Sequence, residues 1–141
     1  MMLVRSRVAA SSIEGLGVYA DEFIPSGTLV WQLNRNFITT FRRADLEQFP
    51  FHIREFVEKY SFPDFEDVSL LYIELDNGRF MNHSETPNTD FTAFHKGYAI
   101  RDIAVGEEIT CNYYEFDSTF QGFGEHALPI QNGHPAIWAA E

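Results

Sequence analysis

The sequence predicts a mainly β fold with one short helical insert. Three observations support this class. Short runs of β-branched and aromatic residues alternate with Gly and Pro along most of the chain, which is typical of strands joined by turns. A single stretch repeats its apolar residues at helical spacing. With 141 residues and 45% hydrophobic content, the chain is long enough for one hydrophobic core and too short for two domains.

Four short strands are expected in the first 42 residues. The Ile24-Pro25-Ser26-Gly27 segment supplies a turn in the middle of this region. The runs on either side of it are rich in β-branched, aromatic and small apolar residues, as strands are. The expected strands cover residues 8–10, 15–20, 28–33 and 36–40.

The helical insert is expected at about 43–62. Between Asp45 and Tyr60, apolar residues recur at three- and four-residue steps, and charged residues fill the other face. Pro50 lies inside this pattern, so either it belongs to the first turn of a continuous helix or the helix begins near Phe51. The apolar positions are Leu46, Phe49, Ile53, Phe56, Val57 and Tyr60.

The second half of the chain is expected to return to short strands. These cover residues 68–75, 89–94, 97–100 and 108–112, with a turn at 104–106. From Tyr114 onward no periodicity is evident. Residues 116–141 are therefore expected to form a tail that is either docked irregularly or partly disordered.

Composition narrows the classes of function. The net charge of -11 argues against a general nucleic-acid binder and favours a basic partner such as a Lys-rich peptide, although acidity is also a common solubility feature. The single cysteine, Cys111, excludes an internal disulfide and a Cys-cluster zinc site, which fits a reducing compartment. No apolar run has the length of a signal peptide or a membrane span, so we expect a soluble intracellular protein without membrane association.

The most informative segment is Arg79-Phe80-Met81-Asn82-His83-Ser84-Glu85-Thr86-Pro87-Asn88. It lies between strand-like runs, so its polar side chains would cross the middle of a small domain, where they need partners. Such a crossing indicates a ligand. His83 is a weak candidate for a general base or a metal ligand because the five histidines are scattered, and Ser84 lacks the Gly-x-Ser-x-Gly pattern of a hydrolase nucleophile.

Two further motifs stand on either side of this segment. Gly15-Leu16-Gly17 lacks the third glycine of a dinucleotide-binding motif, so it is either a bend between strands or a place where a ligand reaches the backbone. Downstream, Gly106-Glu107-Glu108-Ile109-Thr110-Cys111-Asn112-Tyr113 is a turn followed by a strand that ends in tyrosine. Taken in order, the three motifs resemble the SET-domain family of protein-lysine methyltransferases over roughly Val4 to Tyr114.

The resemblance implies a β-clip (SET) fold at residues 1–115, in which the Asn-His segment and the C-terminal Tyr strand cross in a knot-like arrangement. It also implies S-adenosylmethionine as cofactor. By position, the backbones of Gly15, Leu16 and Gly17 would hold the methionine part. Arg79 would approach its carboxylate, Asn82 would bind near its amino group, and the His83 backbone would read the adenine edge.

By the same resemblance, Tyr113 is the expected catalytic residue, whose phenol would orient the lysine amine or the methyl group. Without the motifs, a tyrosine at a strand end is as readily a core residue with a solvated tip. Tyr72, Phe91 and Cys111 are candidates for a narrow lysine channel, although aromatics on short strands are often core. Cys111 replaces the usual Tyr or Phe of the family, which indicates a roomy channel and product that is di- or trimethylated.

The implied partner is a lysine-containing basic protein or peptide, such as a histone-like protein, and not nucleic acid. The alternative is a weak or inactive SET-like module that binds peptide or cofactor without turnover. A homodimer is compatible with the sequence. The location would be cytoplasmic in a bacterium and nuclear in a eukaryote or for a viral protein. No cysteine-rich zinc segment follows the domain, so the tail, through Phe116, Phe120, Phe123 or Trp138, would either close the site or merely dock on the core.

Overall fold

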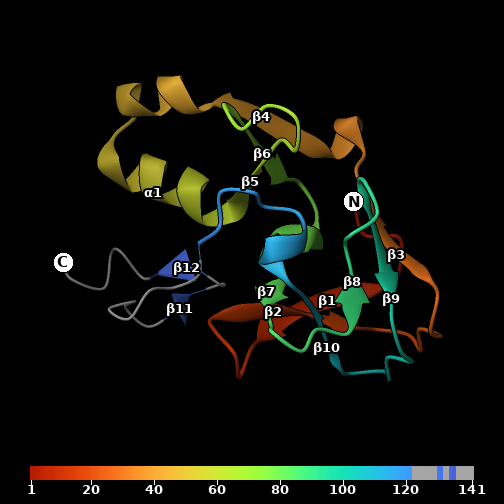
Figure 1. The fold of residues 1–141 in the computed structure, drawn as a ribbon. Helices are drawn as coiled ribbons and strands as arrows, with labels where there is room; N and C mark the ends of the chain where they lie inside the picture. The colour runs from red at the N-terminus through yellow and green to blue at the C-terminus, as the bar shows by residue number, and fades with distance from the viewer. Residues whose placement is uncertain (122–129, 132–133, 136–141) are drawn as a thin grey trace.

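Four small β-sheets and one α-helix make up the described part of the chain, which is residues 1–121, 130–131 and 134–135 of this computed structural model (Figure 1). This confirms the expected mainly β class with a short helical insert. The tail after residue 121 lies outside the described residues apart from β11 (Ile130–Gln131) and β12 (His134–Pro135), which pair with each other.

The first sheet has four strands in the order β1-β2-β10-β7. Its first pair is a hairpin whose turn contains Gly15, at φ 43, a left-handed conformation that glycine adopts without a steric penalty. β10 runs antiparallel to β2 and parallel to β7. The strands are β1 (Ser6–Ala10), β2 (Leu16–Ala20), β7 (Asn82–His83) and β10 (Glu108–Cys111).

The second sheet contains β3 (Leu29–Gln32), β9 (Lys96–Ala99) and β8 (Thr89–Asp90), in that order. The expected strand at 89–94 is therefore too long. It ends at Asp90 because the Asp90 carboxylate accepts hydrogen bonds from the backbone N–H and the hydroxyl of Thr92, at 2.7 and 2.6 Å. This local turn competes with strand pairing and leads into a loop that includes Phe91.

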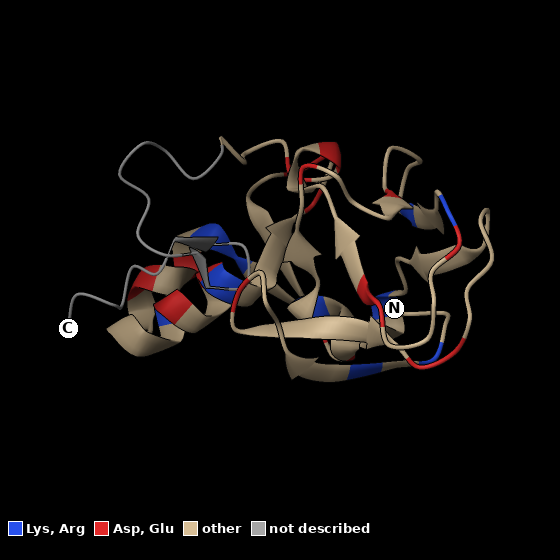
Figure 2. Ribbon diagram, turned by 90° about the horizontal axis from the view of Figure 1, so that it is seen from below, with Lys and Arg blue, Asp and Glu red and all other residues tan. Residues whose placement is uncertain are grey.

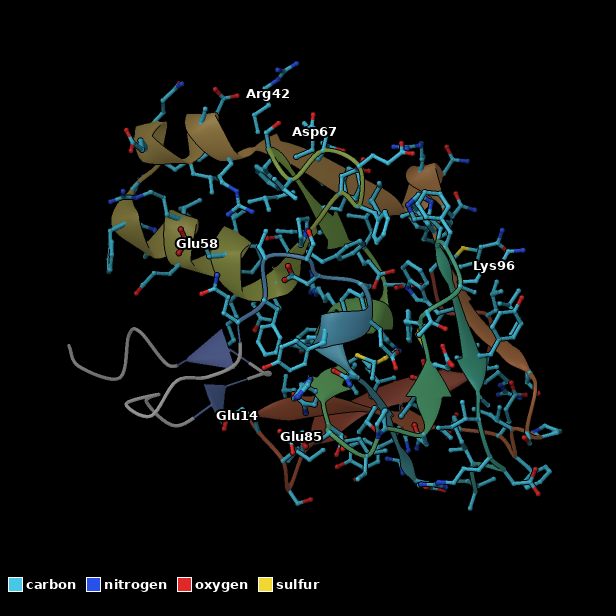
Figure 3. The ribbon with its side chains drawn as sticks, viewed as in Figure 1. Glu14, Arg42, Glu58, Asp67, Glu85 and Lys96 are labelled. Carbon is cyan, nitrogen blue, oxygen red and sulfur yellow. The ribbon has the colours of Figure 1, made fainter. Side chains whose placement is uncertain are left out.

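The third sheet has the order β4-β6-β5. The strand expected at 36–40 begins only at Ile38 in the structure. The residues before it form a 3-10 turn, which Asn34 caps by accepting the N–H of Asn36 at 2.9 Å. Arg42 and Asp67 lie at the same end of this sheet (Figure 3). β5 was not expected from the sequence. The elements are η1 (Arg35–Phe37), β4 (Ile38–Arg42), β5 (Ser61–Pro63), β6 (Leu70–Glu74) and η3 (Asn77–Phe80).

The helical insert is divided at Pro50. A 3-10 helix, η2 (Arg43–Gln48), precedes α1 (Phe51–Tyr60), so the helix begins at Phe51 as the second alternative predicted. The expected single apolar face is only partly correct. Leu46 and Val57 are buried against Leu71 and Ile73, whereas Phe49, Ile53 and Phe56 remain 36–44% exposed. The break at Pro50 changes the chain direction, so one continuous face cannot cover the sheet.

The main core joins the first two sheets. Ile24 and Ile103 form an isolated bridge between their loops, and both side chains are almost fully buried. Figure 1 places α1 on one side of the molecule and β3 and β9 on the other. Acidic residues are spread over several loops and over α1, where basic residues accompany them (Figure 2). The core also includes Val18, Ala20, Val30, Ala99 and Ile109.

Candidate active site

The polar segment at Asn82 and the last strand of the first sheet meet at the centre of the molecule. Thr110 lies opposite Asn82, and Cys111 lies opposite His83, in the parallel pair β7–β10. Just beyond β10, in η4 (Tyr113–Glu115), the backbone N–H of Tyr113 donates to His83 Nδ1 at 3.0 Å. These hydrogen bonds bring together two motifs that are about 30 positions apart in the sequence.

Asn88 completes the crossing in a structural role. Its Nδ2 donates to the Glu108 carbonyl at 2.7 Å, and its Oδ1 accepts the Thr110 N–H at 2.9 Å. The Thr89 hydroxyl donates to the Thr110 carbonyl at 2.7 Å. Part of the polar segment is therefore satisfied by the backbone of β10 and needs no ligand.

Asn82 differs from Asn88 because its amide nitrogen has hydrogen-bond partners while its amide oxygen has none among the described residues. The fully buried side chain donates from Nδ2 to the carbonyls of Glu14 and Leu16, both at 3.1 Å, and to Glu108 Oε1 at 2.9 Å. Its Oδ1 is buried and has no hydrogen-bond partner among the described residues. Rotating the amide would turn Oδ1 toward three other acceptors, so the orientation is fixed by the network. Asn82 therefore presents an unsatisfied acceptor.

Gly17 makes room for the Glu108 carboxylate. A β-carbon at this position would overlap that carboxylate, which also accepts the Ser11 hydroxyl at 2.9 Å. From the sequence, this glycine was expected either to form a bend or to let a ligand reach the backbone. In the structure, the group that lies close to Gly17 is the Glu108 side chain. A cofactor-binding role for the Gly15, Leu16 and Gly17 backbones stays a prediction.

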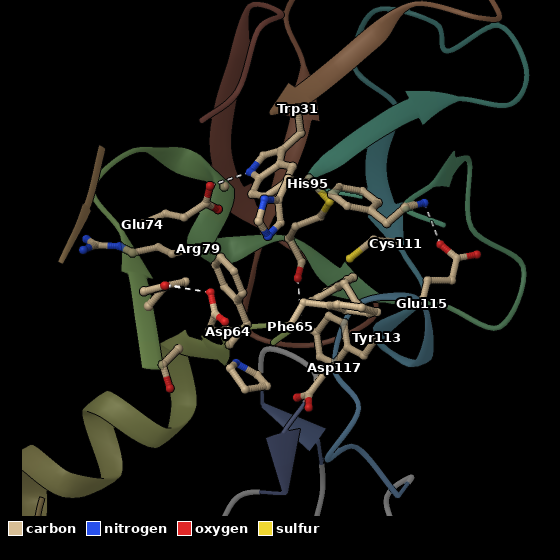
Figure 4. Close-up of a pocket in the computed structure, with 18 of the residues that line it drawn as sticks. Trp31, Asp64, Phe65, Glu74, Arg79, His95, Cys111, Tyr113, Glu115 and Asp117 are labelled. Carbon is tan, nitrogen blue, oxygen red and sulfur yellow. Dashed lines mark hydrogen bonds between the residues drawn. The ribbon is translucent and has the colours of Figure 1, made fainter. Parts of the chain in front are cut away.

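A cavity of about 250 Å³ lies beside the crossing. Five of the predicted site residues line it: Tyr72, Arg79, Phe91, Cys111 and Tyr113. Figure 4 shows Arg79 on one side of the cavity and Cys111 and Tyr113 on the other. The remaining predicted residues, Gly15, Leu16, Gly17, Asn82 and His83, are not among the lining residues. Of the residues expected to hold the cofactor, only Arg79 therefore lines the cavity that contains the expected channel.

Tyr113 is held at the cavity wall by both its backbone and its phenol. The hydroxyl donates to the Met81 carbonyl at 2.8 Å, and the side chain is 8% exposed. Burial raises the pKa of Tyr113 well above its usual value, and Cys111 and Asp117 add to this. The phenol therefore stays neutral, and with its proton donated to Met81 its oxygen can act toward the cavity only as an acceptor.

Phe91 is fixed in the cavity wall from three sides. Its ring lies 5.3 Å from the Trp31 ring and 5.4 Å from the Phe116 ring, measured between centroids. A β-carbon on Gly97 would lie 2.5 Å from Phe91 Cζ, so the absence of a side chain there lets the ring sit against β9. The Phe91 N–H donates to Glu115 Oε2 at 2.8 Å.

Tyr72 contributes a polar chain at the opposite wall. Its hydroxyl donates to Asp64 Oδ2 at 2.7 Å and accepts from the Arg35 guanidinium at 3.3 Å. Burial alone would raise the pKa of Asp64, but hydrogen bonds from Tyr72 and from the backbone of residues 66 and 67 outweigh it and lower this pKa. A buried, charged carboxylate thus stands in the cavity wall.

Comparison with known proteins identifies the architecture. A model of the SET domain matches residues 15–114, which is more than half of the chain. The chain belongs to the SET-domain family. A Candida albicans histone-lysine N-methyltransferase specific for H3 lysine 36 is 28% identical over 142 residues, covering 92% of this chain and 16% of that protein. The SET domain described here thus spans about one sixth of the length of that curated relative.

Solved structures with the same fold include a candidate histone methyltransferase of Plasmodium falciparum. It has a TM-score of 0.55 and 21% identity, over 79% of this chain and 95% of that one. The Chaetomium thermophilum polycomb repressive complex 2 matches with a TM-score of 0.55 and 22% identity, over 78% of this chain and 15% of that one. These likenesses support the SET fold.

Several cavity residues were not predicted from the sequence, among them Glu74 and Trp31. Glu74 is 4% exposed and accepts a hydrogen bond from the Trp31 indole. Burial raises the pKa of this carboxyl group, and the N-terminal ammonium 2.8 Å away opposes the shift. The available signal was one charged residue inside the apolar run at 70–75.

Two of the tail aromatics pack on this SET domain near Tyr113. The Phe116 ring lies 5.6 Å from the Tyr113 ring, and the Phe120 ring lies 5.4 Å from His83 and 5.6 Å from Tyr113. Phe123 and Trp138 lie outside the described residues.

Among the described residues, no three His, Cys, Asp or Glu side chains are grouped so that they could hold a metal ion. Within the same ranges, no helix is long and apolar enough to cross a membrane.

The His83 imidazole serves the architecture of the crossing. Because Nδ1 accepts the Tyr113 N–H, this nitrogen carries no proton. Burial lowers the pKa of His83 below its usual 6.5, and the Glu85 carboxylate partly opposes this. The neutral form is thus favoured in the folded state, as its acceptor role requires.

Acidification is expected to weaken the fold through His83. Because its folded pKa lies below the unfolded value of 6.5, the unfolded chain binds more protons, so the contribution of His83 is complete above that pH and is lost below it. Denaturant unfolding at about pH 7.5 and about pH 5.5 should show a larger loss for the wild type than for His83→Asn, which keeps an acceptor but does not titrate. Equal losses would show that folding does not shift the pKa of this imidazole.

Proposed function

We propose that this SET domain is an S-adenosylmethionine-dependent protein-lysine N-methyltransferase that acts on a basic protein or peptide. The observation that carries the proposal is the position of Tyr113. Its neutral phenol lies in the wall of a cavity lined by several aromatic side chains, next to the parallel pair β7–β10. The family match and the methyltransferases among the relatives support the same activity.

The side chains at the crossing fit the methionine part of the cofactor. The unsatisfied Oδ1 of Asn82 is an acceptor suited to an ammonium group. Arg79 is suited to a carboxylate, because its Nε is buried without a hydrogen-bond partner and none of the described carboxylates forms an ion pair with it. Its guanidinium lies 4.8 Å from the Phe80 ring, which holds it in place.

The chain's own contribution to the reaction is alignment and exclusion of water. When bound, S-adenosylmethionine supplies a methyl group on a positively charged sulfur. Phe91, Cys111 and Tyr113 would surround the lysine side chain, and the apolar wall would favour the neutral amine over the ammonium form. The phenol oxygen of Tyr113 would accept a hydrogen bond from the amine and so direct its lone pair along the line of attack.

Charge supports a basic substrate. Besides the net charge of -11, four carboxylates line the cavity against three basic side chains (Lys59, Arg79 and Lys96), and Asp64 is kept ionised by its hydrogen bonds. A lysine ammonium would be attracted to this opening before it loses its proton inside. The carboxylates are Asp64, Glu74, Glu115 and Asp117.

The proposal is tested by incubating the protein with labelled S-adenosylmethionine and a panel of basic proteins and peptides. Each peptide is paired with a copy in which every lysine is replaced by arginine, so that charge is preserved while the acceptor amine is removed. Label is expected only in the lysine versions. Cofactor binding in calorimetry without transfer to any substrate would instead identify a SET-like binding module without turnover.

The product is expected to be di- or trimethyl-lysine. Cys111 and Phe91 face the cavity without a phenol hydroxyl, so no hydrogen bond in this part of the wall would hold a monomethyl-amine in an unproductive orientation. Mass spectrometry under excess enzyme should show product beyond the monomethyl state, and Cys111→Tyr should shift it toward monomethyl-lysine. A wild-type reaction that stops at one methyl group would contradict the expectation.

We also propose that the segment from Phe116 onward closes the site. Phe120 supports this because its ring lies against His83, beside the expected position of the adenine. The test is calorimetric titration with S-adenosylmethionine of the full chain and of a chain ending at residue 115. Unchanged affinity in the shorter chain would refute the role.

A further inference from the structure

Two exposed aromatic side chains meet at the opening of the cavity. Phe65 is 57% exposed and Phe94 is 55% exposed, yet their rings form an edge-to-face pair with centroids 5.6 Å apart and planes at 82°. Phe65 comes from the loop between β5 and β6, and Phe94 comes from the loop between β8 and β9. Both line the cavity that contains Tyr113. Two large apolar side chains left in solvent at one opening mark a binding surface.

The loop that carries Phe94 is held in a costly conformation. His95 has a φ of 57°, and it is the only residue other than glycine with a positive φ in the described part of the chain. Its ring stacks on the Phe94 ring at 3.6 Å, and its carbonyl accepts the Leu33 N–H at 3.0 Å. Such backbone strain persists where the surroundings fix it and is common at functional sites. Here it presents Phe94 across from Phe65.

The same opening offers an edge for an extended peptide. β5 is the outer strand of the sheet β4-β6-β5 among the described residues, and Ser61, Phe62 and Pro63 line the cavity. Just after β5, the charged carboxylate of Asp64 precedes Phe65 (Figure 4). An apolar contact therefore lies next to a negative charge. This pairing matches a segment in which an apolar side chain neighbours a lysine.

We propose that Phe65 and Phe94 form an aromatic rim that binds a large apolar side chain beside the target lysine. The occupant is an extended segment of the substrate protein, with Leu, Met or Phe within two positions of the lysine. This inference rests on the proposed lysine methyltransferase function and adds a sequence preference to it. The rim selects the substrate, while Tyr113 and the channel receive the lysine itself.

The test uses two labelled peptides that differ in one residue, Leu or Ser, next to a single lysine. Peptide binding is measured by fluorescence anisotropy and methyl transfer by mass spectrometry. The wild type is expected to prefer the Leu peptide about tenfold in Kd and KM, as partial burial of one Leu side chain implies. Phe65→Ala and Phe94→Ala should each remove most of this preference.

Phe23→Ala is the matched control. Phe23 is also 57% exposed but does not line the cavity, so its replacement should keep the tenfold preference. Thermal unfolding of all variants excludes misfolding as the cause.

Transfer without a preference for Leu would overturn the proposed role of the rim and leave the methyltransferase proposal intact. A Leu preference in binding that depends on Phe65, without transfer to either peptide, would support the rim and overturn the proposed activity. Failure of both peptides to bind would overturn the rim.

Discussion

Replacing Tyr113 by Phe is expected to reduce methyl transfer by about 10²–10³-fold while the protein stays folded. The change removes one oxygen atom and keeps the ring in its contacts with Phe116 and Phe120. It also leaves the buried Met81 carbonyl without its donor, which should cost about 1–3 kcal/mol of unfolding free energy. The loss of rate follows because a phenyl ring cannot accept a hydrogen bond from the attacking amine.

Single-turnover rates with saturating cofactor separate this effect from weaker binding. Tyr114→Phe is the matched control, because it removes the same hydroxyl from the adjacent residue, which is 55% exposed. That variant should keep a rate near the wild-type value. If Tyr113→Phe retained the wild-type rate as well, Tyr113 would be a core residue with a polar tip, and the proposed alignment role would be wrong.

Sequence reasoning reached the crossing because its parts are local motifs. The segment at Asn82 and the strand ending at Tyr113 carry residue types that are costly to bury without partners, and the family resemblance connected them. It could not assign the partners within the crossing. Whether the Asn82 amide would meet a ligand, Glu108 or the carbonyls of residues 14 and 16 depends on a packing that no spacing in the sequence encodes.

The cavity wall was harder to predict for the same reason. Trp31, Phe62 and Glu74 reach it from strands in two different sheets, and none of them stands in a motif. Strand ends were also misjudged where a short polar side chain offered the backbone another hydrogen bond, as Asp90 does for Thr92. The fold prediction was therefore limited by polar side chains that offer the backbone local hydrogen bonds. The site prediction was limited because its residues come together only in the tertiary structure.

Asn82→Asp is expected to destabilise the protein by about 3–5 kcal/mol and to abolish cofactor binding. The new side chain has the same shape but no N–H group. It would remove the hydrogen bonds to the carbonyls of Glu14 and Leu16. It would also place a second carboxylate against that of Glu108, which lies 2.9 Å from the present amide nitrogen. Denaturant unfolding measures the stability, and calorimetry with S-adenosylmethionine measures the binding.

The design of a rescue follows from the same three hydrogen bonds. Glu108→Gln in the Asn82→Asp background removes the repulsion and supplies an amide donor at position 108, so it should recover part of the lost stability. Recovery should be incomplete, because the side chain at position 82 still donates no hydrogen bond to the two carbonyls. The Asn82→Asp variant alone should also become less stable as the pH rises from about 4 to 7. Burial beside Glu108 raises the pKa of the new carboxyl group in the folded state, so the folded protein prefers its protonated form. Additive effects of the two substitutions would show that Asn82 and Glu108 are not coupled and that the half-satisfied amide does not organise the crossing.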